Sequence, residues 1–489
     1  MNSITFDHSY HRLPESFYAR ARPLSVRAPE LIAFNHELAA ALGLELSSVD
    51  RSALALLFSG NRLPESAEPI ALAYAGHQFG HFVPQLGDGR AHLLGELLAP
   101  DGVRHDLQLK GSGRTPFSRG GDGRAALGPV LREYLLSEAM HALGVPTTRA
   151  LAAVTTGETV MRDVPRPGAI VARVARSHIR VGTFEYFAAR GDQAALAVLA
   201  DYAIGRHDPE LGKLDDRYAR WLEAILDRQA RLVARWLSLG FIHGVMNTDN
   251  TAVSGETIDY GPCAFMDHYD PAQVFSSIDR NGRYAYANQP RIAHWNLARL
   301  AEALLGLLST DRQQATEIAN DILEGFAARF ERYWLGAMRP KLGLQQADDD
   351  DAALIQDLLD LMEAQRADFS QTFRKLANLV AQDRNAAELQ FESQPALDAW
   401  LQRWRRRLQN EPGGPAAAAR LMAAHNPAFI PRNHQVERAI RAAEDRGDFS
   451  IFHELRQLLV QPYRNQPEFT AYAEPPEPHE RVLQTFCGT

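Results

Sequence analysis

The sequence predicts an α+β fold with a small lobe that contains a sheet and a large, mostly helical lobe. Three observations predict it. Short alternating runs with strand character, such as HLLGELL and HDLQLK, occur between residues 71 and 185. From about residue 190, apolar residues recur at three- and four-residue spacing, as in Ala194 to Ala203 and Tyr218 to Leu239. After Asn288 the helical pattern dominates, and breaks are expected at the acidic run Asp348 to Asp351 and at Gly413-Gly414-Pro415.

The composition is typical of a soluble globular protein, with 45% hydrophobic and 23% charged residues. A net charge of -8 argues against nonspecific binding of nucleic acid by the whole surface. No run reaches the ~18 apolar residues that a membrane span needs, and the N-terminus lacks an apolar signal core. The two cysteines, Cys263 and Cys487, cannot form a disulfide framework or a zinc cluster. We therefore expect a cytoplasmic protein.

The stretch from Phe241 to Asp267, FIHGVMNTDNTAVSGETIDYGPCAFMD, has the spacing of a protein-kinase active site. In the kinase catalytic loop, His-Arg-Asp is followed at a fixed distance by Asn; the Asp acts on the acceptor hydroxyl and the Asn binds a metal ion. His243 and Asn250 keep this spacing, but Val245 stands at the Asp position. Asp259-Tyr260-Gly261 then resembles the metal-binding Asp-Phe-Gly. The pattern suggests that the protein carries out nucleotide chemistry other than ordinary phosphoryl transfer, or that it carries out no nucleotide chemistry.

A lysine and a glutamate upstream match the kinase pair that grips nucleotide phosphates. Lys110 ends a strand-like segment, and Glu133 lies on a predicted helix with Pro129 in its first turn and Gly144 at its end. On a helical wheel, Glu133 lies beside the apolar face, so its carboxylate can point inward. The alternative is that both side chains are simply solvated.

Glycines surround Lys110 in an order that neither the kinase glycine-rich loop nor the Walker A loop has. Gly87-Asp88-Gly89-Arg90 lies upstream, and Gly111, Gly113, Gly120, Gly121 and Gly123 follow. Such backbone can present N–H groups to phosphate oxygens, and the alternative is a set of turns between short strands. The displaced glycines suggest that the nucleotide is bound differently from its pose in a kinase.

Arginines form a third cluster. Five of them occur close together in an acidic protein: Arg162, Arg166, Arg173, Arg176 and Arg180. Guanidinium groups bind phosphate oxygens in bidentate fashion, so this segment is a candidate phosphate-binding element. The alternative, a solvated face with partners elsewhere, is expected to hold for some of the five.

Several long motifs together resemble the selenoprotein O family. They are YAGHQFGHFVPQLGDGRAHLLGE, LQLKGSGRTPFSRGGDGRAAL, VARVARSHIRVGTFEYF, HGVMNTDN, DYGPCAFMD and NPAFIPRNHQVERAI. The resemblance covers nearly the whole chain. It implies a protein-kinase-like two-lobed fold that binds ATP in a flipped orientation and transfers AMP to hydroxyl groups of proteins.

The resemblance also implies roles for individual residues. Asp249 would be the base, Glu133 would pair with Lys110, and Asn250 and Asp259 would hold Mg²⁺ or Mn²⁺. The nucleotide contacts would be Gly87, Gly89, Arg90, Lys110, Asp122, Gly123, Arg173, Arg180 and, through the cation, Asp259.

The C-terminus departs from part of the family. Many members carry selenocysteine near the C-terminus, where this chain has Cys487. Some bacterial members have a second cysteine in the loop after the metal-binding Asp, and the corresponding QVFSSIDRNGRY has none. A regulatory disulfide is therefore not expected, and Cys263 is the one possible partner.

The sequence thus predicts a protein adenylyltransferase that uses ATP and acts on protein hydroxyls as a monomer. The expected regions are an N-terminal extension packed on the core (1–70), a nucleotide-binding N-lobe (71–185), a helical C-lobe with the catalytic and metal loops (186–345) and a C-terminal helical extension (346–489). Two alternatives stay open: an atypical kinase that transfers the γ-phosphoryl group, and a noncatalytic ATP-binding scaffold.

Overall fold

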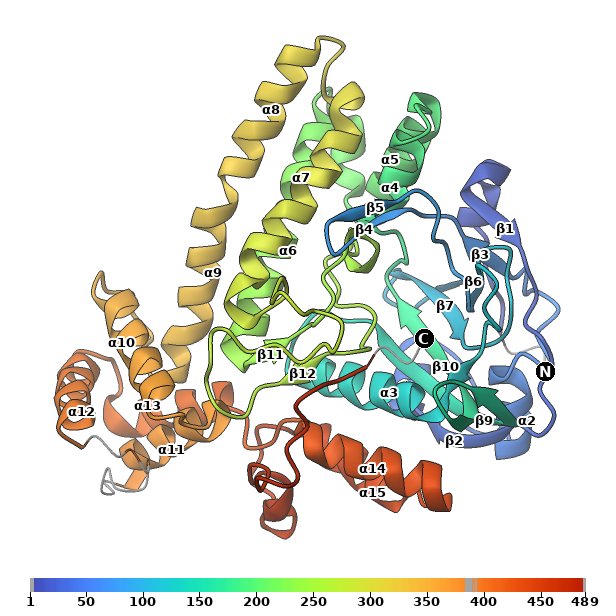
Figure 1. The fold of residues 1–489 in the computed structure, drawn as a ribbon. Helices are drawn as coiled ribbons and strands as arrows, with labels where there is room; N and C mark the ends of the chain where they lie inside the picture. The colour runs from blue at the N-terminus through green and yellow to red at the C-terminus, as the bar shows by residue number, and fades with distance from the viewer. Residues whose placement is uncertain (1–3, 383–388, 390, 392–393, 487–489) are drawn as a thin grey trace.

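The computed structural model describes residues 4–382, 389, 391 and 394–486, and it confirms the α+β fold (Figure 1). The main sheet lies to one side of the molecule, and long helices occupy the other side. Its strand order is β1-β3-β6-β7-β10-β9-β2, with the short β8 beside β10, and every pairing is antiparallel. The strands are β1 (Tyr18–Arg20), β2 (Glu30–Phe34), β3 (Ile70–Leu72), β6 (Ala91–Leu98), β7 (Arg104–Lys110), β8 (Ala125–Ala126), β9 (Arg149–Met161) and β10 (Pro165–Ala175).

The predicted strands HLLGELL and HDLQLK are β6 and β7, which pair with each other. Residues before position 70 belong to the same sheet, since β1 and β2 form its two ends. Two short helices follow β2, α1 (His36–Ala41) and α2 (Arg51–Phe58), and Asn35 and Asp50 cap their N-termini.

Helix α3 (Leu127–Ala142) packs against β9 and β10 and carries Glu133. Its start and end confirm the predicted positions of Pro129 and Gly144; Gly144 adopts φ +77°, which suits a helix stop. The other face of α3 contacts α14 (Asn433–Arg446) and α15 (Ser450–Leu459), seen below it in Figure 1. Glu444 accepts a hydrogen bond from the Gly128 N–H at 3.0 Å, so the C-terminal region braces the helix that holds Glu133.

The helical part confirms the predicted change of pattern near residue 190. It begins with α4 (Val181–Ala188), α5 (Gln193–His207) and α6 (Arg217–Leu239), and continues with α7 (Gln289–Leu308), α8 (Arg312–Glu324) and α9 (Phe326–Lys341). The last group is α10 (Asp351–Ala364), α11 (Phe369–Gln382), α12 (Gln394–Gln409) and α13 (Gly414–His425). The predicted breaks are confirmed, because α10 begins at Asp351 and α13 at Gly414. No helix among the described residues has the length and apolar character to cross a bilayer.

Two small two-stranded sheets lie between the main sheet and the helices. β11 (Phe241–Ile242) pairs with β12 (Ala264–Phe265), and these two strands bracket the predicted catalytic and metal loops. The hairpin of β4 (Gly76–Gln78) and β5 (His81–Val83) approaches the same loops from the N-terminal half of the chain. Cys263 is buried just before β12, and Cys487 lies outside the described residues.

Candidate active site

The centre of the site is the carboxylate of Asp259, which three cationic side chains contact. Oδ1 accepts hydrogen bonds from Lys110 Nζ at 2.7 Å and from Arg173 Nη1 at 2.6 Å, and Oδ2 accepts one from Arg180 Nη1 at 2.8 Å. Burial alone would raise the pKa of Asp259, but the three positive charges outweigh it and hold the pKa well below the ordinary value. Asp259 is therefore ionised throughout the physiological range.

The backbone of Asp259 is itself unusual. Its φ is +65°, a left-handed conformation that costs a residue other than glycine on the order of 1 kcal/mol. Asp is among the residues that tolerate this region best. The ion pairs to Lys110, Arg173 and Arg180 provide interactions that hold the carboxylate in this position.

Sheet register explains why Lys110 and Arg173 meet at this carboxylate. Arg173 on β10 lies directly opposite Gln108 on β7, and Lys110 lies two residues further along β7, so all three side chains project from one face. Arg173 donates from Nη2 to Gln108 Oε1 at 2.6 Å. Glu133 completes the group from α3, with Oε2 2.6 Å from Lys110 Nζ and Oε1 3.1 Å from Arg173 Nη1. The predicted inward orientation of Glu133 and its ion pair with Lys110 are present.

Arg180 links the N-terminal half to the catalytic loop. It precedes α4 and is buried, and its Nη1 also donates to the backbone oxygen of Asp249 at 2.5 Å. Its guanidinium lies 4.6 Å from the centre of the Tyr74 ring and 3.8 Å from the carboxylate of Asp88. The backbones also pair here, since the Val181 N–H donates to the Thr251 oxygen at 2.9 Å. One arginine thus contacts Asp259, the loop that contains Asp249 and the upstream glycine segment.

Within the loop, the side chains of His243 and Asn250 donate hydrogen bonds to backbone oxygens. His243 stacks on Trp236 and donates from Nε2 to the Ile258 oxygen at 2.9 Å, which ties the catalytic loop to the segment before Asp259. Burial lowers the pKa of His243, so the ring is neutral. Asn250 donates from Nδ2 to the Val245 oxygen at 3.0 Å, which leaves its carbonyl oxygen available to a cation.

Asp249 is buried, and burial raises its pKa to about 6. Its Oδ2 accepts a hydrogen bond from Gln78 Nε2 at 3.2 Å, while Oδ1 is buried and has no hydrogen-bond partner among the described residues. Gly76 packs directly against it, because a methyl group added there would lie 2.6 Å from Oδ1. A buried carboxylate with one free oxygen is a candidate general base.

The glycine segments predicted to contact a nucleotide pack against each other. The Gly111 N–H donates to the Arg90 oxygen at 2.7 Å, and Ser118 Oγ donates to the Gly89 oxygen at 2.5 Å. Gly87 and Gly123 have φ values of +74° and +68°, so each needs the freedom of glycine. The two glycine-rich segments are therefore packed against each other, and they reach the Asp259 cluster where Arg180 approaches Asp88.

The five arginines of the cluster have different partners, and one of them pairs with Asp122, a predicted nucleotide contact. Arg173 and Arg180 join the Asp259 cluster. Arg162 instead pairs with Asp122 at 2.8 Å, and Arg166 pairs with Glu444 at 2.7 Å. The expectation that some of the five have partners elsewhere is confirmed for these two.

Sequence reasoning assigned no role to the β4–β5 hairpin, although its residues lie within the family motif YAGHQFGH. Gln78 contacts Asp249, the Phe79 N–H donates to Asn247 Oδ1 at 3.0 Å, and the His77 N–H donates to Thr248 Oγ1 at 2.6 Å. The length of that motif was the signal in the sequence that could have indicated a role for the hairpin. The hairpin positions three successive residues of the catalytic loop.

The oxygen donors suit a hard divalent cation. Asn250 offers an amide oxygen and Asp259 a carboxylate, and Mg²⁺ typically takes one or two such ligands together with water and substrate phosphates. Among the residues that the structure describes, no group of three or more His, Cys, Asp or Glu side chains is arranged to hold a metal. The residues therefore fit an ion that arrives with a nucleotide, in contrast to an ion enclosed by protein ligands alone.

Comparison with known proteins agrees with this site. Residues 1–460 match the family model described as protein adenylyltransferase SelO. Proteins named protein nucleotidyltransferase YdiU are similar over almost their full length. That of Rhizobium rhizogenes is 59% identical over 488 residues, covering 99% of this chain and 97% of the relative. That of Rhodopseudomonas palustris is 59% identical, covering 99% of each chain, and that of Rhizobium meliloti is 58% identical, covering 100% of each. With the family model matched over most of its length, this chain belongs to the protein adenylyltransferase SelO family.

Proposed function

We propose that this protein transfers AMP from ATP to Ser, Thr or Tyr hydroxyl groups of proteins and releases pyrophosphate. The fold that we assign to it is protein-kinase-like, with the sheet as a small lobe and the helices as a large one. The observation that carries the proposal is that the site contains two carboxylates in different surroundings. Asp259 contacts three cationic side chains, and Asp249 is buried with one oxygen that has no hydrogen-bond partner among the described residues. The loop position where a kinase has its base is occupied by Val245.

In this proposal, Lys110, Arg173 and Arg180 bind the phosphates of ATP. Charge-assisted hydrogen bonds to phosphate are stronger than neutral ones, and preorganised cations stabilise the negative charge that shifts to the leaving group. All three cations contact Asp259, which orients them toward one place. The packed glycine segments support the further nucleotide contacts Gly87, Gly89, Arg90, Asp122 and Gly123.

Asn250 and Asp259 would hold Mg²⁺ or Mn²⁺. When bound, the ion would neutralise phosphate charge and orient the nucleotide. The pairing of Asp259 with Lys110, Arg173 and Arg180 fits this role, because a carboxylate held ionised is ready to accept a cation at any physiological pH.

Asp249 would act as the base. A pKa of about 6 leaves it mostly ionised at neutral pH, yet basic enough to accept a proton. Gln78 orients Oδ2, so Oδ1 can receive the proton of the acceptor hydroxyl. The hydroxyl oxygen then bonds to the α-phosphorus, the bond from that phosphorus to the bridging oxygen breaks, and pyrophosphate leaves with the electron pair.

The experiment that tests this proposal compares ATP labelled at the α- or the γ-phosphate. Label from the α-position should enter protein and label from the γ-position should not, and the acceptor should gain the mass of AMP. Asp249→Asn keeps the shape of the side chain but removes the base, so it should slow transfer while ATP binding stays unchanged. Protein labelled from γ-labelled ATP would support the kinase alternative. The absence of label from either position, with ATP still bound, would support the scaffold.

The remaining expectations belong to the same proposal. The four regions 1–70, 71–185, 186–345 and 346–489 would be the N-terminal extension, the two lobes and the C-terminal extension. The enzyme would work as a cytoplasmic monomer on protein substrates, without a nucleic-acid partner. Size-exclusion chromatography with light scattering measures the oligomeric state directly.

A further inference from the structure

Glu185 is a buried carboxylate beside the catalytic loop, and the reaction described above gives it no role. It lies on α4, the helix that begins directly after Arg180. Helix α4 packs against β4 and against the turn Thr248–Asn250, which contains Asp249, and Figure 1 shows α4 next to β4. Burying a carboxylate costs free energy unless it has hydrogen-bond partners, so the contacts of Glu185 indicate why it is there.

The side chain of Glu185 closes a ring of hydrogen bonds that joins three separate elements. The backbone N–H of His77, on β4, donates to Thr248 Oγ1 at 2.6 Å. The Thr248 hydroxyl donates to Oε2 of Glu185, and Oε1 of Glu185 is hydrogen-bonded to Nδ1 of His77 at 2.5 Å. Thr248 and Glu185 are buried, so loss of one member of the ring would leave a buried polar group without its partner.

The ring lies one residue before the two side chains that meet at the proposed base. On the hairpin side, His77 directly precedes Gln78. On the loop side, Thr248 directly precedes Asp249, whose Oδ2 accepts a hydrogen bond from Gln78 Nε2 at 3.2 Å. A methyl group added to Gly76 would lie 2.6 Å from Asp249 Oδ1, so the hairpin approaches both carboxylate oxygens closely. The ring therefore fixes the hairpin against the catalytic loop at the place where the base is held.

Helix α4 also connects the ring to the phosphate-binding side of the site. Arg180 stands immediately before α4, and Glu185 lies in its second turn. In the first turn, the Gly182 oxygen accepts a hydrogen bond from the Ala75 N–H at 2.9 Å. A methyl group added to Gly182 would lie 3.4 Å from the Cα atom of Asp249. One short helix thus contacts the start of the hairpin and the base, and it begins at one of the three cations.

We propose that Glu185 is a positioning residue for the transfer reaction. It acts through Thr248 and His77, which hold Asp249 in place for the acceptor hydroxyl. This inference rests on the proposed function, in which Asp249 is the base. Both oxygens of Glu185 are engaged by Thr248 and His77, so Glu185 orients the loop and does not itself take the proton. A shift of about 1 Å in a reacting group can cost about a hundredfold in rate, so the ring should affect kcat.

Replacements of Thr248 test the ring without removing a charge. Thr248→Val has nearly the same shape but no hydroxyl, so kcat should fall about tenfold or more while the KM for ATP stays within about twofold. Thr248→Ser keeps the hydroxyl and should retain most of the activity. Thr148→Val is the matched control, because the Thr148 hydroxyl is also buried but has no hydrogen-bond partner among the described residues. Its kcat should equal that of the unmodified protein.

Hydrogen exchange followed by mass spectrometry separates this inference from the proposed function. In Thr248→Val and in Glu185→Ala, peptides covering residues 76–83 and 245–251 should exchange faster than in the unmodified protein, and peptides from α9 should not change. The rates are measured with whichever phosphate label enters protein, so transfer of the γ-phosphoryl group would contradict the proposed function but leave the test of the ring intact. In a protein that transfers neither label, exchange alone decides.

Three results would overturn the inference. The first is equal kcat in Thr248→Val and Thr248→Ser. The second is a rise in the KM for ATP as large as the fall in kcat, which would indicate a general loss of structure. The third is unchanged exchange of both segments in Thr248→Val and Glu185→Ala.

Discussion

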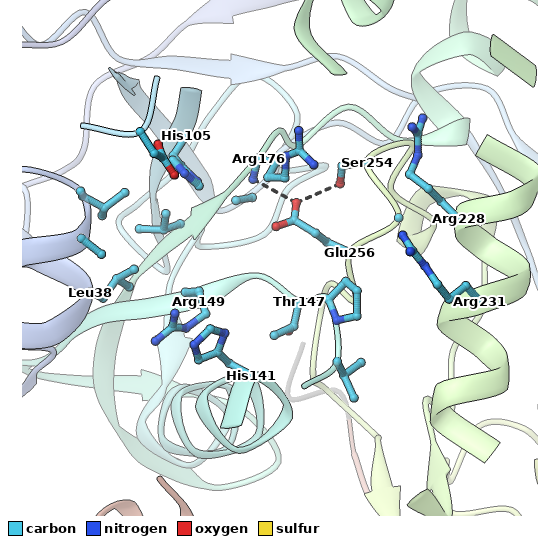
Figure 2. A pocket seen from close by; sticks show the side chains of 18 residues that line it. Leu38, His105, His141, Thr147, Arg149, Arg176, Arg228, Arg231, Ser254 and Glu256 are labelled. Carbon is cyan, nitrogen blue, oxygen red and sulfur yellow. Dashed lines mark hydrogen bonds between the residues drawn. The ribbon is translucent and has the colours of Figure 1, made fainter. Parts of the chain in front are cut away.

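The segment from Asn250 to Asp259 carries two carboxylates that are held differently. We call the surroundings of Asp259 the front and the surroundings of Glu256 the back. On the front, Asp259 contacts Lys110, Arg173 and Arg180, and each of these cations lies within 2.8 Å of a carboxylate oxygen. On the back, Glu256 accepts hydrogen bonds from the Arg176 backbone N–H and the Ser254 hydroxyl, as Figure 2 shows. The front is therefore a network of ion pairs, whereas on the back the hydrogen bonds to the carboxylate come from neutral donors.

This difference affects the two pKa values in opposite directions. Both carboxylates are half-buried, and their removal from water favours the neutral form, but only at Asp259 do neighbouring cations outweigh this effect. The Asp259 carboxylate is therefore charged throughout the physiological pH range, whereas the charge of Glu256 changes near neutral pH. Variants on the two sides should therefore change different properties: AMP transfer on the front, and the pH dependence of stability on the back.

The largest effect is expected for Asp259→Ala. The cation loses its carboxylate ligand and three cationic groups lose their common partner, so AMP transfer should fall by at least about a hundredfold. Quantitative labelling with α-labelled ATP measures this. Asp270→Ala is the control, because Asp270 accepts a hydrogen bond from the nearby Ala272 N–H outside the cluster, and it should transfer AMP normally. Normal transfer by a folded Asp259→Ala protein would contradict the metal assignment.

A smaller effect is expected when one cation of the front is removed. A hydrogen bond to a charged group contributes about 1.5–3 kcal/mol, so Lys110→Ala or Arg180→Ala should raise the ATP requirement tenfold or more. Nucleotide titrations of AMP transfer give this value. Arg166→Ala removes an arginine from the same stretch of chain that pairs instead with Glu444, and its titration should match that of the unmodified protein. Identical titrations for all three variants would place the phosphates elsewhere.

The β4–β5 hairpin gives a more local test of the front. Gly76→Ala would push a methyl group to within 2.6 Å of Asp249 Oδ1, so the base should move and kcat should fall about tenfold or more while ATP binding stays unchanged. Gly205→Ala in α5 meets no atom within 4 Å and should have no effect on kcat. Equal kcat in both variants would show that the position of Asp249 does not limit the reaction.

The sequence predicted some of these contacts and could not predict others. Motif spacing was enough to predict four site residues, because it places them on a strand end, a helix and two loops: Lys110, Glu133, Asn250 and Asp259. Asp249 was assigned through the family resemblance, since Val245 removes the usual base and spacing alone selects no replacement.

Other contacts depend on how distant segments meet. Gln78 and Asp88 reach the site because a hairpin and a loop fold onto residues more than 80 positions away. The back depends on the end of β10 meeting the turn that holds Glu256, which no local pattern in the sequence encodes. The arginine cluster shows the same limit, because the register of β10 against β7 selects Arg173 for the front.

The test of the back concerns stability in place of activity, and it uses Glu256→Gln. The pKa of Glu256 is raised from an ordinary value of 4.5 to about 7, so between these values the folded state binds more protons than the unfolded state. Stability should therefore fall as pH rises through this window, by at most about 3 kcal/mol for this one group. The amide of Gln keeps an oxygen for the Arg176 N–H but carries no charge. Urea unfolding at pH 5 and pH 8 should thus show the variant gaining stability relative to the unmodified protein at the higher pH. If the difference between the two proteins is the same at both pH values, the surroundings of Glu256 do not raise its pKa, and the contrast between the back and the front is wrong.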